Sequence, residues 1–351
     1  MSRTVLITGG SGFFGSLLAR HLVAAGDTVR NFDIAAPDDP LADIEFVKGN
    51  ILDRKVLREA CEGVDVVFHN VAQVPLAREK HLLERVNIDG TANLLDAARD
   101  AGVGKVVHTS SSAVFGIPAS NPVYEDTQPR PVELYGRAKL RAEGLCHDAA
   151  SRGLDVTIIR PRTILGHGRL GITSILFDWV ADGAPAFVLG RGDNKYQFVH
   201  ALDLAEACRL ASERSGPTVY NVGAADFGTM RETLEALVDH AATGSKVRSL
   251  PMRPAIVAMK ALSRLNLAPF APYHWLLYGE SLWFDVSKAR KELGWEPRYS
   301  NRDMIIESYD WFLEHRDALS EHAGSHHRSL VRQGLLKSLK RITRGSASLG
   351  R

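Results

Sequence analysis

The first fifteen residues constrain the fold more than any other part of the chain. A short run rich in β-branched residues, Thr4–Thr8, is followed at once by glycines at three-residue spacing, Gly9, Gly12 and Gly15. An apolar pattern with helical spacing comes next. A strand, a glycine turn and a helix N-terminus form a cradle in which backbone N–H groups and the helix dipole meet the phosphates of a dinucleotide. A plain strand-to-helix turn has the same pattern, so the interpretation needs support from the rest of the chain.

Further β-rich runs alternate with helical patterns along the next hundred residues. We expect strands at 28–32, 46–47, 64–69 and 105–109, and a helix at 84–99. This rhythm predicts an α/β fold with a doubly wound parallel sheet of the Rossmann type. Asp33 follows the second expected strand. Its carboxylate can accept hydrogen bonds from ribose hydroxyls and repel a 2′-phosphate, which favours NAD over NADP, although an ordinary strand-end aspartate is the alternative.

A candidate proton-transfer pair lies farther along the chain. Tyr135 and Lys139 are four residues apart, so in a helix they lie on one face. A free tyrosine has a pKa of about 10, and a neighbouring ammonium group favours the phenolate. A nicotinamide cation beside the pair has the same effect. The result is an acid/base that can move a hydroxyl proton near neutral pH. The spacing also occurs by chance, so its weight comes from its surroundings.

Length and composition exclude several classes of protein. The 351 residues suffice for one large α/β domain and a smaller lobe. Three widely spaced cysteines show no Cys-x-x-Cys pair, so neither disulfides nor a metal site is expected, and a reducing, cytoplasmic compartment fits. The chain begins with a strand pattern rather than a signal peptide. No apolar run is long enough to span a bilayer.

The charge is concentrated at the C-terminus. Residues 322–351 carry seven Lys/Arg and no acid, whereas residues 1–321 have a net charge of −5, which does not suggest nucleic-acid binding. On a helical projection of 330–344, one side carries the apolar residues Val331, Leu335, Leu339 and Ile342, and the other carries the basic residues Lys337, Lys340, Arg341 and Arg344. We therefore expect either a basic amphipathic helix on the inner face of an anionic membrane or a solvated, disordered tail.

Several motifs in order along the chain carry a specific resemblance. They include Thr-Gly-Gly-Ser-Gly-Phe-Phe-Gly (8–15), Gly-Asn-Ile-Leu-Asp (49–53), His-Asn-Val-Ala (69–72), Thr-Ser-Ser-Ser-Ala-Val-Phe-Gly (109–116), Tyr-Gly-Arg-Ala-Lys (135–139), Ile-Arg-Pro (159–161) and Tyr-Asn-Val-Gly (220–223). Across roughly the first 315 residues the chain resembles the extended short-chain dehydrogenases/reductases of the NAD-dependent epimerase/dehydratase superfamily. The resemblance implies an NAD-binding part at about 1–165, a smaller C-terminal substrate-binding lobe from 166–198 and 224–321, and the separate tail 322–351.

The resemblance also implies roles for individual residues. Tyr135 becomes the acid/base, Lys139 the ribose ligand that lowers the tyrosine pKa, and Ser111 the catalytic hydroxyl. Ser110 and Ser112 are alternatives to Ser111, and at least one of them is expected to have a capping or turn role. The implied cofactor-binding residues are Gly9, Gly12, Phe13, Phe14, Gly15, Asp33, Asn50, Ile51, Val71, Ala72, Thr109, Ser110, Tyr135, Lys139 and Pro161. Asn50 departs from the acid that the family usually has there.

Two other departures concern the substrate. Nucleotide-sugar epimerases usually carry an arginine four residues before the position of His200, where this chain has Tyr196, and another within 273–282, which here is aromatic and apolar. A diphosphate needs fixed cationic donors, whereas an apolar pocket suits a lipid or sterol. The pattern is closer to the 3β-hydroxysteroid dehydrogenase-like branch. Two readings stay open: Trp275, Leu276 and Leu277 as plain core, and Arg162, Arg169 and Arg191 as phosphate ligands.

The expected function is therefore NAD-dependent interconversion of a secondary alcohol and a ketone on a hydrophobic small molecule, by a homodimer. A nucleotide-sugar epimerase or dehydratase that uses bound NAD transiently is the alternative. A cofactor-binding regulator without turnover is a third possibility, but it does not need Ser111, Tyr135 and Lys139 together. His200 is expected to be structural, and nothing in the sequence fixes a role for His167.

Overall fold

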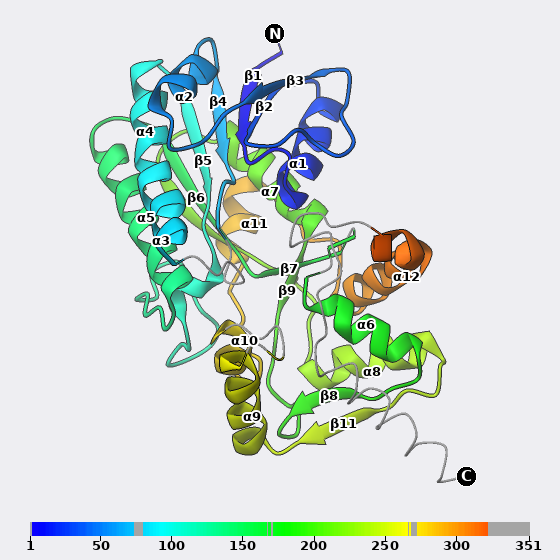
Figure 1. The fold of residues 1–351 in the computed structure, drawn as a ribbon. Coiled ribbons are helices and arrows are strands. Elements are labelled where there is room, and N and C mark those ends of the chain that lie inside the picture. Colours follow the sequence, from blue (N-terminus) through cyan, green and yellow to red (C-terminus); the bar gives the residue numbers. More distant parts are fainter. Residues whose placement is uncertain are drawn as a thin grey trace. The chain divides into compact units, whose positions relative to one another are not determined.

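A seven-stranded parallel sheet forms the centre of one of the two compact units of the chain (Figure 1). The computed structural model describes residues 2–73, 80–166, 168–169, 171–265, 267 and 272–321. The strand order of this sheet is β10-β6-β5-β4-β1-β2-β3. The strands are β1 (Thr4–Thr8), β2 (Thr28–Asp33), β3 (Ile44–Lys48), β4 (Val66–His69), β5 (Lys105–Thr109), β6 (Val156–Pro161) and β10 (Thr218–Val222). Every neighbouring pair is parallel, which confirms the expected α/β, doubly wound fold.

Helices cover both faces of this sheet, because its strands are apolar on both sides. One layer contains α2 (Arg54–Cys61), α3 (Lys80–Glu84), α4 (Gly90–Asp100) and α5 (Leu134–Ser151), and the other contains α1 (Phe13–Ala24), α7 (Ala201–Glu213) and α11 (Ser287–Leu293) (Figure 1). Leu6, Val67 and Val106, from adjacent strands, are fully buried in one cluster with α2, α4 and α5 residues. The order β1-β2-β3 on one side of β1 and β4-β5-β6-β10 on the other brings the carboxyl ends of β1, β2 and β4 together.

The helix expected at 84–99 is not regular. A π-helical turn, η1 (Arg85–Asp89), separates α3 from α4. The Asn87 side chain accepts from the backbone N–H of Gln73 at 2.8 Å and donates to its carbonyl at 3.0 Å, while Thr91 donates to the Asn87 carbonyl at 2.8 Å. The two bonds to Gln73 fix the backbone of that residue, and a π turn accommodates the shift in helical register.

The chain divides into two compact units. The first comprises 1–163, 201–223 and 284–297, and the second comprises 164–200, 224–283 and the residues from 298 on. The second unit contains the parallel pair β8 (Ala186–Leu189) and β11 (Val247–Leu250), and the pair β7 (Thr163–Leu165) and β9 (Phe198–His200). Its helices are α6 (Thr173–Ala181), α8 (Met230–Ala241), α9 (Met252–Arg264), α10 (Pro272–Leu277) and α12 (Asn301–Glu321).

The segment 284–297 differs from the expected division, which placed it in the second lobe. Trp295 is fully buried in the first unit and donates from Nε1 to the Asp203 carbonyl at 2.8 Å. Lys288 donates to the Val219 carbonyl at 2.9 Å. The burial of Trp295 and the hydrogen bond of the Lys288 ammonium group explain why this segment packs on β10 and α7.

Two expectations fall outside the described residues: the basic tail at 322–351 and His167. Among the helices that the structure describes, none combines the length and the apolar character needed to cross a bilayer. All three cysteines are buried and free.

Candidate active site

The glycine turn after β1 leaves a cradle of bare backbone. Gly9 adopts a positive φ of 73°, and its N–H donates to the Phe32 carbonyl at 2.9 Å. A Cβ on Gly15 would lie 2.1 Å from the Gly9 oxygen, and a Cβ on Gly9 would lie 3.0 Å from the Val71 nitrogen. Gly12 begins α1 without a side-chain cap. The cradle therefore fits the close approach of a pyrophosphate to a helix N-terminus, as a dinucleotide requires.

Asp33 lies at the carboxyl end of β2, beside this turn. Its carboxylate accepts from the N–H of Ser11 at 3.1 Å and from the N–H of Ala35 at 3.3 Å. Burial raises the pKa of Asp33, and these backbone hydrogen bonds oppose the shift. The carboxylate is thus tied to the glycine turn, where a dinucleotide would place its adenosine ribose.

The other expected cofactor residues lie along the same edge of the sheet. Asn50 holds its own turn, because its side chain accepts from the Leu52 N–H at 3.0 Å. Ile51 is buried against Gly90, where an added Cβ would lie 2.8 Å from the isoleucine side chain. Val71 and Ala72 are half-buried in the loop after β4, and Pro161 ends β6.

Tyr135 and Lys139 lie one turn apart near the start of α5, as the sequence predicts. Lys139 is buried, and its Nζ donates to the Thr109 carbonyl at 2.6 Å. Tyr135 is half-buried and packs in a cluster with Leu83, Ile88 and Ala138. Its neighbour Gly136 would place a Cβ 2.4 Å from the Ala113 oxygen, so the first turn of α5 packs directly against the 3₁₀ turn η2 (Ser112–Phe115).

The three consecutive serines have different surroundings. Ser110 is buried, and its hydroxyl donates to Glu143 Oε1 at 2.5 Å. Ser112 is also buried. Ser111 is half-buried and caps η2 by accepting from the Ala113 N–H at 3.2 Å, a bond that leaves the hydroxyl hydrogen available to a ligand. The capping role expected of a flanking serine thus belongs to Ser111 itself, whereas Ser110 bonds a side chain of α5. The catalytic role of Ser111 stays a prediction. Thr109 donates to Asn70 Oδ1 at 2.6 Å.

Sequence reasoning missed a buried ion pair behind these residues. Arg160 on β6 donates to Glu143 on α5 at 2.9 and 2.7 Å, and both side chains are at most 5% exposed. The Arg160 guanidinium also donates to the Glu125 carbonyl and lies 5.0 Å from the centre of the Phe115 ring. A signal existed, since Glu143 follows Lys139 at the same four-residue spacing that separates Lys139 from Tyr135.

Burial lowers the pKa of Lys139 to about 8, and the Glu143 carboxylate opposes this shift. The nearby Cys146 thiol has a pKa that burial raises to about 12, so it is neutral in this range and contributes little charge. Lys139 is therefore protonated at neutral pH and loses its proton under mildly alkaline conditions.

A second missed residue is Glu133, which caps α5. Its carboxylate accepts from the backbone N–H groups of Tyr135 at 2.7 Å and Gly136 at 2.6 Å. Burial raises the pKa of Glu133, and these bonds oppose that shift. An acid immediately before a helix is a recognised start signal, and here it fixes the backbone of Tyr135.

The residues singled out for the substrate are distributed over both units. Tyr196 is 4% exposed and packs against Phe198, and Leu277 is also buried, whereas Trp275 and Leu276 are half-buried. Arg162 is buried with its guanidinium 5.6 Å from the Phe284 ring. Arg191 forms an exposed ion pair with Asp193. His200 is fully buried, stacks on Tyr299 and contacts Glu307 at 2.9 Å, which agrees with a structural role.

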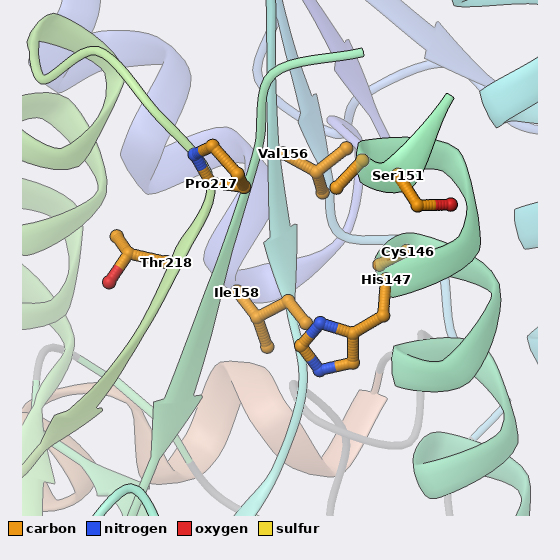
Figure 2. Close-up of a pocket in the computed structure, with 8 residues that line it drawn as sticks. Cys146, His147, Ser151, Val156, Ile158, Pro217 and Thr218 are labelled. Atoms are coloured by element: carbon orange, nitrogen blue, oxygen red, sulfur yellow. The ribbon is translucent and has the colours of Figure 1, made fainter. Parts of the chain in front are cut away.

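A cavity of about 270 Å³ in the first unit is not part of this site (Figure 2). It lies between the C-terminal half of α5 and the first residues of β6 and β10, and His147 extends from the helix toward Ile158. The expected cofactor residues lie at the carboxyl ends of the strands, which is where open α/β sheets bind ligands. The lining residues are Cys146, His147, Ala150, Ser151, Val156, Ile158, Pro217 and Thr218.

Comparison with known proteins identifies the family. Residues 5–223 match the model of the NAD dependent epimerase/dehydratase family. An uncharacterized protein of Sinorhizobium fredii, y4nG, is 54% identical over 96% of this chain and 85% of its own length. Sterol demethylase protein B of Methylococcus capsulatus is 33% identical over 89% and 98% of the two chains. A 3β-hydroxysteroid dehydrogenase/Δ5→4-isomerase of Mycobacterium tuberculosis is 30% identical over 88% and 90%.

The fold has solved counterparts. The structure of MoeE5 in complex with UDP-glucose and NAD superimposes with a TM-score of 0.71 at 25% identity, covering 89% of this chain and 99% of that one. Together with the family match, this shows an enzyme of the extended short-chain dehydrogenase/reductase type with NAD as its cofactor.

We expect Asp33→Ala to narrow the preference for NAD over NADP. Loss of hydrogen bonds from a carboxylate to the ribose should weaken NAD binding about tenfold, while loss of its repulsion should improve NADP binding. Titration of both nucleotides by calorimetry measures the two affinities. Asp96→Ala, on the surface of α4, is the control and should change neither. Tighter binding of NADP than NAD by the unmodified protein would contradict the prediction.

Glu143→Gln should lower both stability and the upper pH limit of activity. Removing the carboxylate leaves Arg160 buried without its counter-charge, which should cost about 3 kcal/mol in urea unfolding. Because Glu143 favours the charged form of Lys139, its loss should move the decline of rate at alkaline pH to lower pH. The control Glu206→Gln breaks a more exposed pair with Arg209 and should cost less than about 1 kcal/mol. An unchanged pH profile would show that Glu143 does not influence the protonation of Lys139.

Proposed function

This chain belongs to the NAD dependent epimerase/dehydratase family, and we propose that it interconverts a secondary alcohol and the corresponding ketone on a sterol-like or lipid-like substrate. The observation that carries the chemistry is the arrangement at the start of α5, where Tyr135 is fixed by the Glu133 cap and stands one turn from the buried ammonium of Lys139. Such a pair suits transfer of a hydroxyl proton.

In the direction of oxidation, Tyr135 takes the proton of the substrate hydroxyl as the carbon–oxygen double bond forms. Ser111 donates its hydroxyl hydrogen to the same oxygen and holds it. Lys139 stabilises the tyrosine phenolate by its charge, and Glu143 keeps Lys139 protonated in the working pH range. NAD, which the glycine turn and Asp33 would hold, would supply the acceptor for the hydride that leaves the substrate carbon.

The residues at two positions where nucleotide-sugar epimerases usually carry an arginine support the proposed substrate class. Tyr196, in place of an arginine, is buried in an apolar cluster of the second unit, and 273–282 contains no arginine. Fixed cationic donors for a diphosphate are missing from both places. The relatives from M. capsulatus and M. tuberculosis, whose names refer to sterols and steroids, agree with this choice.

The alternative is a nucleotide-sugar epimerase or dehydratase, which the MoeE5 complex with UDP-glucose supports. The two functions differ in redox balance: a dehydrogenase accumulates NADH, whereas an epimerase returns the hydride to its product. A panel of hydroxysteroids, long-chain 3-hydroxy lipids and nucleotide sugars, followed both at the NADH absorbance band and by product analysis, distinguishes them. Absence of turnover with every compound would favour a cofactor-binding regulator.

On whichever substrate turns over, we expect Tyr135→Phe to reduce the rate by about 10²–10⁴ and to leave NAD affinity within a few-fold. Only the hydroxyl carries the proton, while the ring keeps its packing against Ile88 and Ala138. Tyr124→Phe, which alters a 48% exposed tyrosine of the same unit, is the control. A rate close to that of the unmodified protein would remove Tyr135 as the acid/base.

We also propose that the enzyme is a cytoplasmic homodimer and that the basic tail, 328–344, binds the inner face of an anionic membrane. This segment carries six Lys/Arg and no acid, and that charge supports the contact. A chain that ends at Ala323 should keep its activity on a water-soluble substrate and sediment less with anionic vesicles than the full chain, with a difference that shrinks at high salt. Equal sedimentation of the two forms at low salt would assign the tail no membrane role.

A further inference from the structure

One helix of the second unit, α9 (Met252–Arg264), is apolar in sequence and yet has no buried residue. Met252, Ile256 and Met259 share one side of the helix and are half-buried, and Leu262 packs against the small cluster of Ile175, Trp179 and Ala184. The opposite side faces solvent. An exposed helix of a globular protein normally presents polar residues there, so the composition of this outer side needs an explanation.

The outer side carries two parallel rows of residues. Val257, Ala261 and Leu265 follow one another at four-residue spacing, and all three are exposed. At 66% exposure each, Val257 and Leu265 are the most exposed large apolar side chains in the part of the chain that the structure describes. Pro254 and Ala258 extend this apolar row on its far side.

The second row is basic. Arg253, Lys260 and Arg264 are exposed and fall within a narrow arc beside Val257. Within the described residues, none of these three cations forms an ion pair with a carboxylate. The whole segment 240–279 contains five Lys/Arg and no Asp/Glu, whereas the rest of residues 1–321 has ten more acidic than basic residues. Positive charge is therefore concentrated around this helix in an otherwise acidic body.

We propose that α9 is a lipid-binding helix that lies in the interface of an anionic membrane, with the row of Val257 and Leu265 among the acyl chains and the row of Arg253, Lys260 and Arg264 against the headgroups. An apolar row flanked by cations on a solvent-facing helix is the pattern of interfacial helices. Thirteen residues span about 20 Å, too short for a hydrocarbon core of about 30 Å, so the helix lies along the surface. Because an anionic membrane repels the acidic remainder of residues 1–321, the protein should approach the membrane with this helix first.

The test is a fluorescent probe at a single new cysteine. The three native cysteines are buried, with thiol pKa values that burial raises to about 12, so Val257→Cys is the site that reacts with an environment-sensitive dye. Phosphatidylglycerol/phosphatidylcholine vesicles should shift the emission to the blue, and brominated lipids should quench it. Leu313→Cys, on an exposed position of α12, is the matched control and should not respond.

Charge reversal tests the basic row. Arg253→Glu with Lys260→Glu, in the labelled full chain, should raise the vesicle concentration for half-maximal signal by roughly tenfold or more. Lys55→Glu with Arg58→Glu, which makes the same charge change on α2, should have a much smaller effect. Circular dichroism of each variant verifies the fold.

Three results would overturn the proposal. The first is an unchanged signal at Val257→Cys with anionic vesicles. The second is an equal response at Val257→Cys and Leu313→Cys, which would mean that the tail alone brings the protein to the membrane. The third is a blue shift that appears without lipid and grows with protein concentration, which would make the outer side of α9 a contact between copies of this chain.

Discussion

The carboxylate of Glu143 is the interaction on which the candidate active site depends. It accepts hydrogen bonds from Ser110 and Arg160 and acts on the charge of Lys139, so one buried anion serves the loop after β5, the strand β6 and the face of α5. Two buried cations share this single anion. The network therefore retains a net positive charge one turn from Tyr135, which is the electrostatic condition for a stable phenolate. An ion pair of this kind adds little to stability on its own; its effect here is to fix a charge in place.

Two glycines allow the close backbone contacts that shape the rest of the candidate site. Gly15 allows α1 to start against the Gly9 carbonyl, and Gly136 allows the first turn of α5 to touch η2. At the contact between Gly15 and Gly9, the bare backbone leaves room for a pyrophosphate. At the second, the turn capped by Ser111 is brought against the helix that carries Tyr135 and Lys139. Any larger residue would separate these elements, because the atoms that a Cβ would meet belong to the backbone.

What the sequence predicts and what it misses follow from the range of the interactions. Tyr135, Lys139 and the glycine turn are local patterns, so the sequence predicted that the first two lie one helical turn apart and that the third follows a strand, as the structure has them. The four-residue spacing from Lys139 pointed to Glu143, but its partner Arg160 lies on a strand and no local pattern joins the two. The π turn at Asn87 depends on a bond to Gln73, fourteen residues away, which no local pattern shows. The basic character of the outer side of α9 was missed for another reason. The charge was summed over residues 1–321, and the total of −5 does not reveal that the segment 240–279 contains no acid.

The proposed substrate class and the proposed lipid-binding helix rest on different residues, so each can fail alone, but they have a common physical consequence. A sterol or long-chain lipid partitions into a bilayer by burial of its apolar surface, about 0.8 kcal/mol per CH₂ group, and its concentration in water is correspondingly low. An enzyme that lies on the membrane through α9 meets such a substrate where it is abundant. A nucleotide sugar stays in water, and an enzyme acting on it gains nothing from the contact. Binding of α9 to lipid would therefore favour the sterol-like substrate over the nucleotide sugar before any turnover is measured.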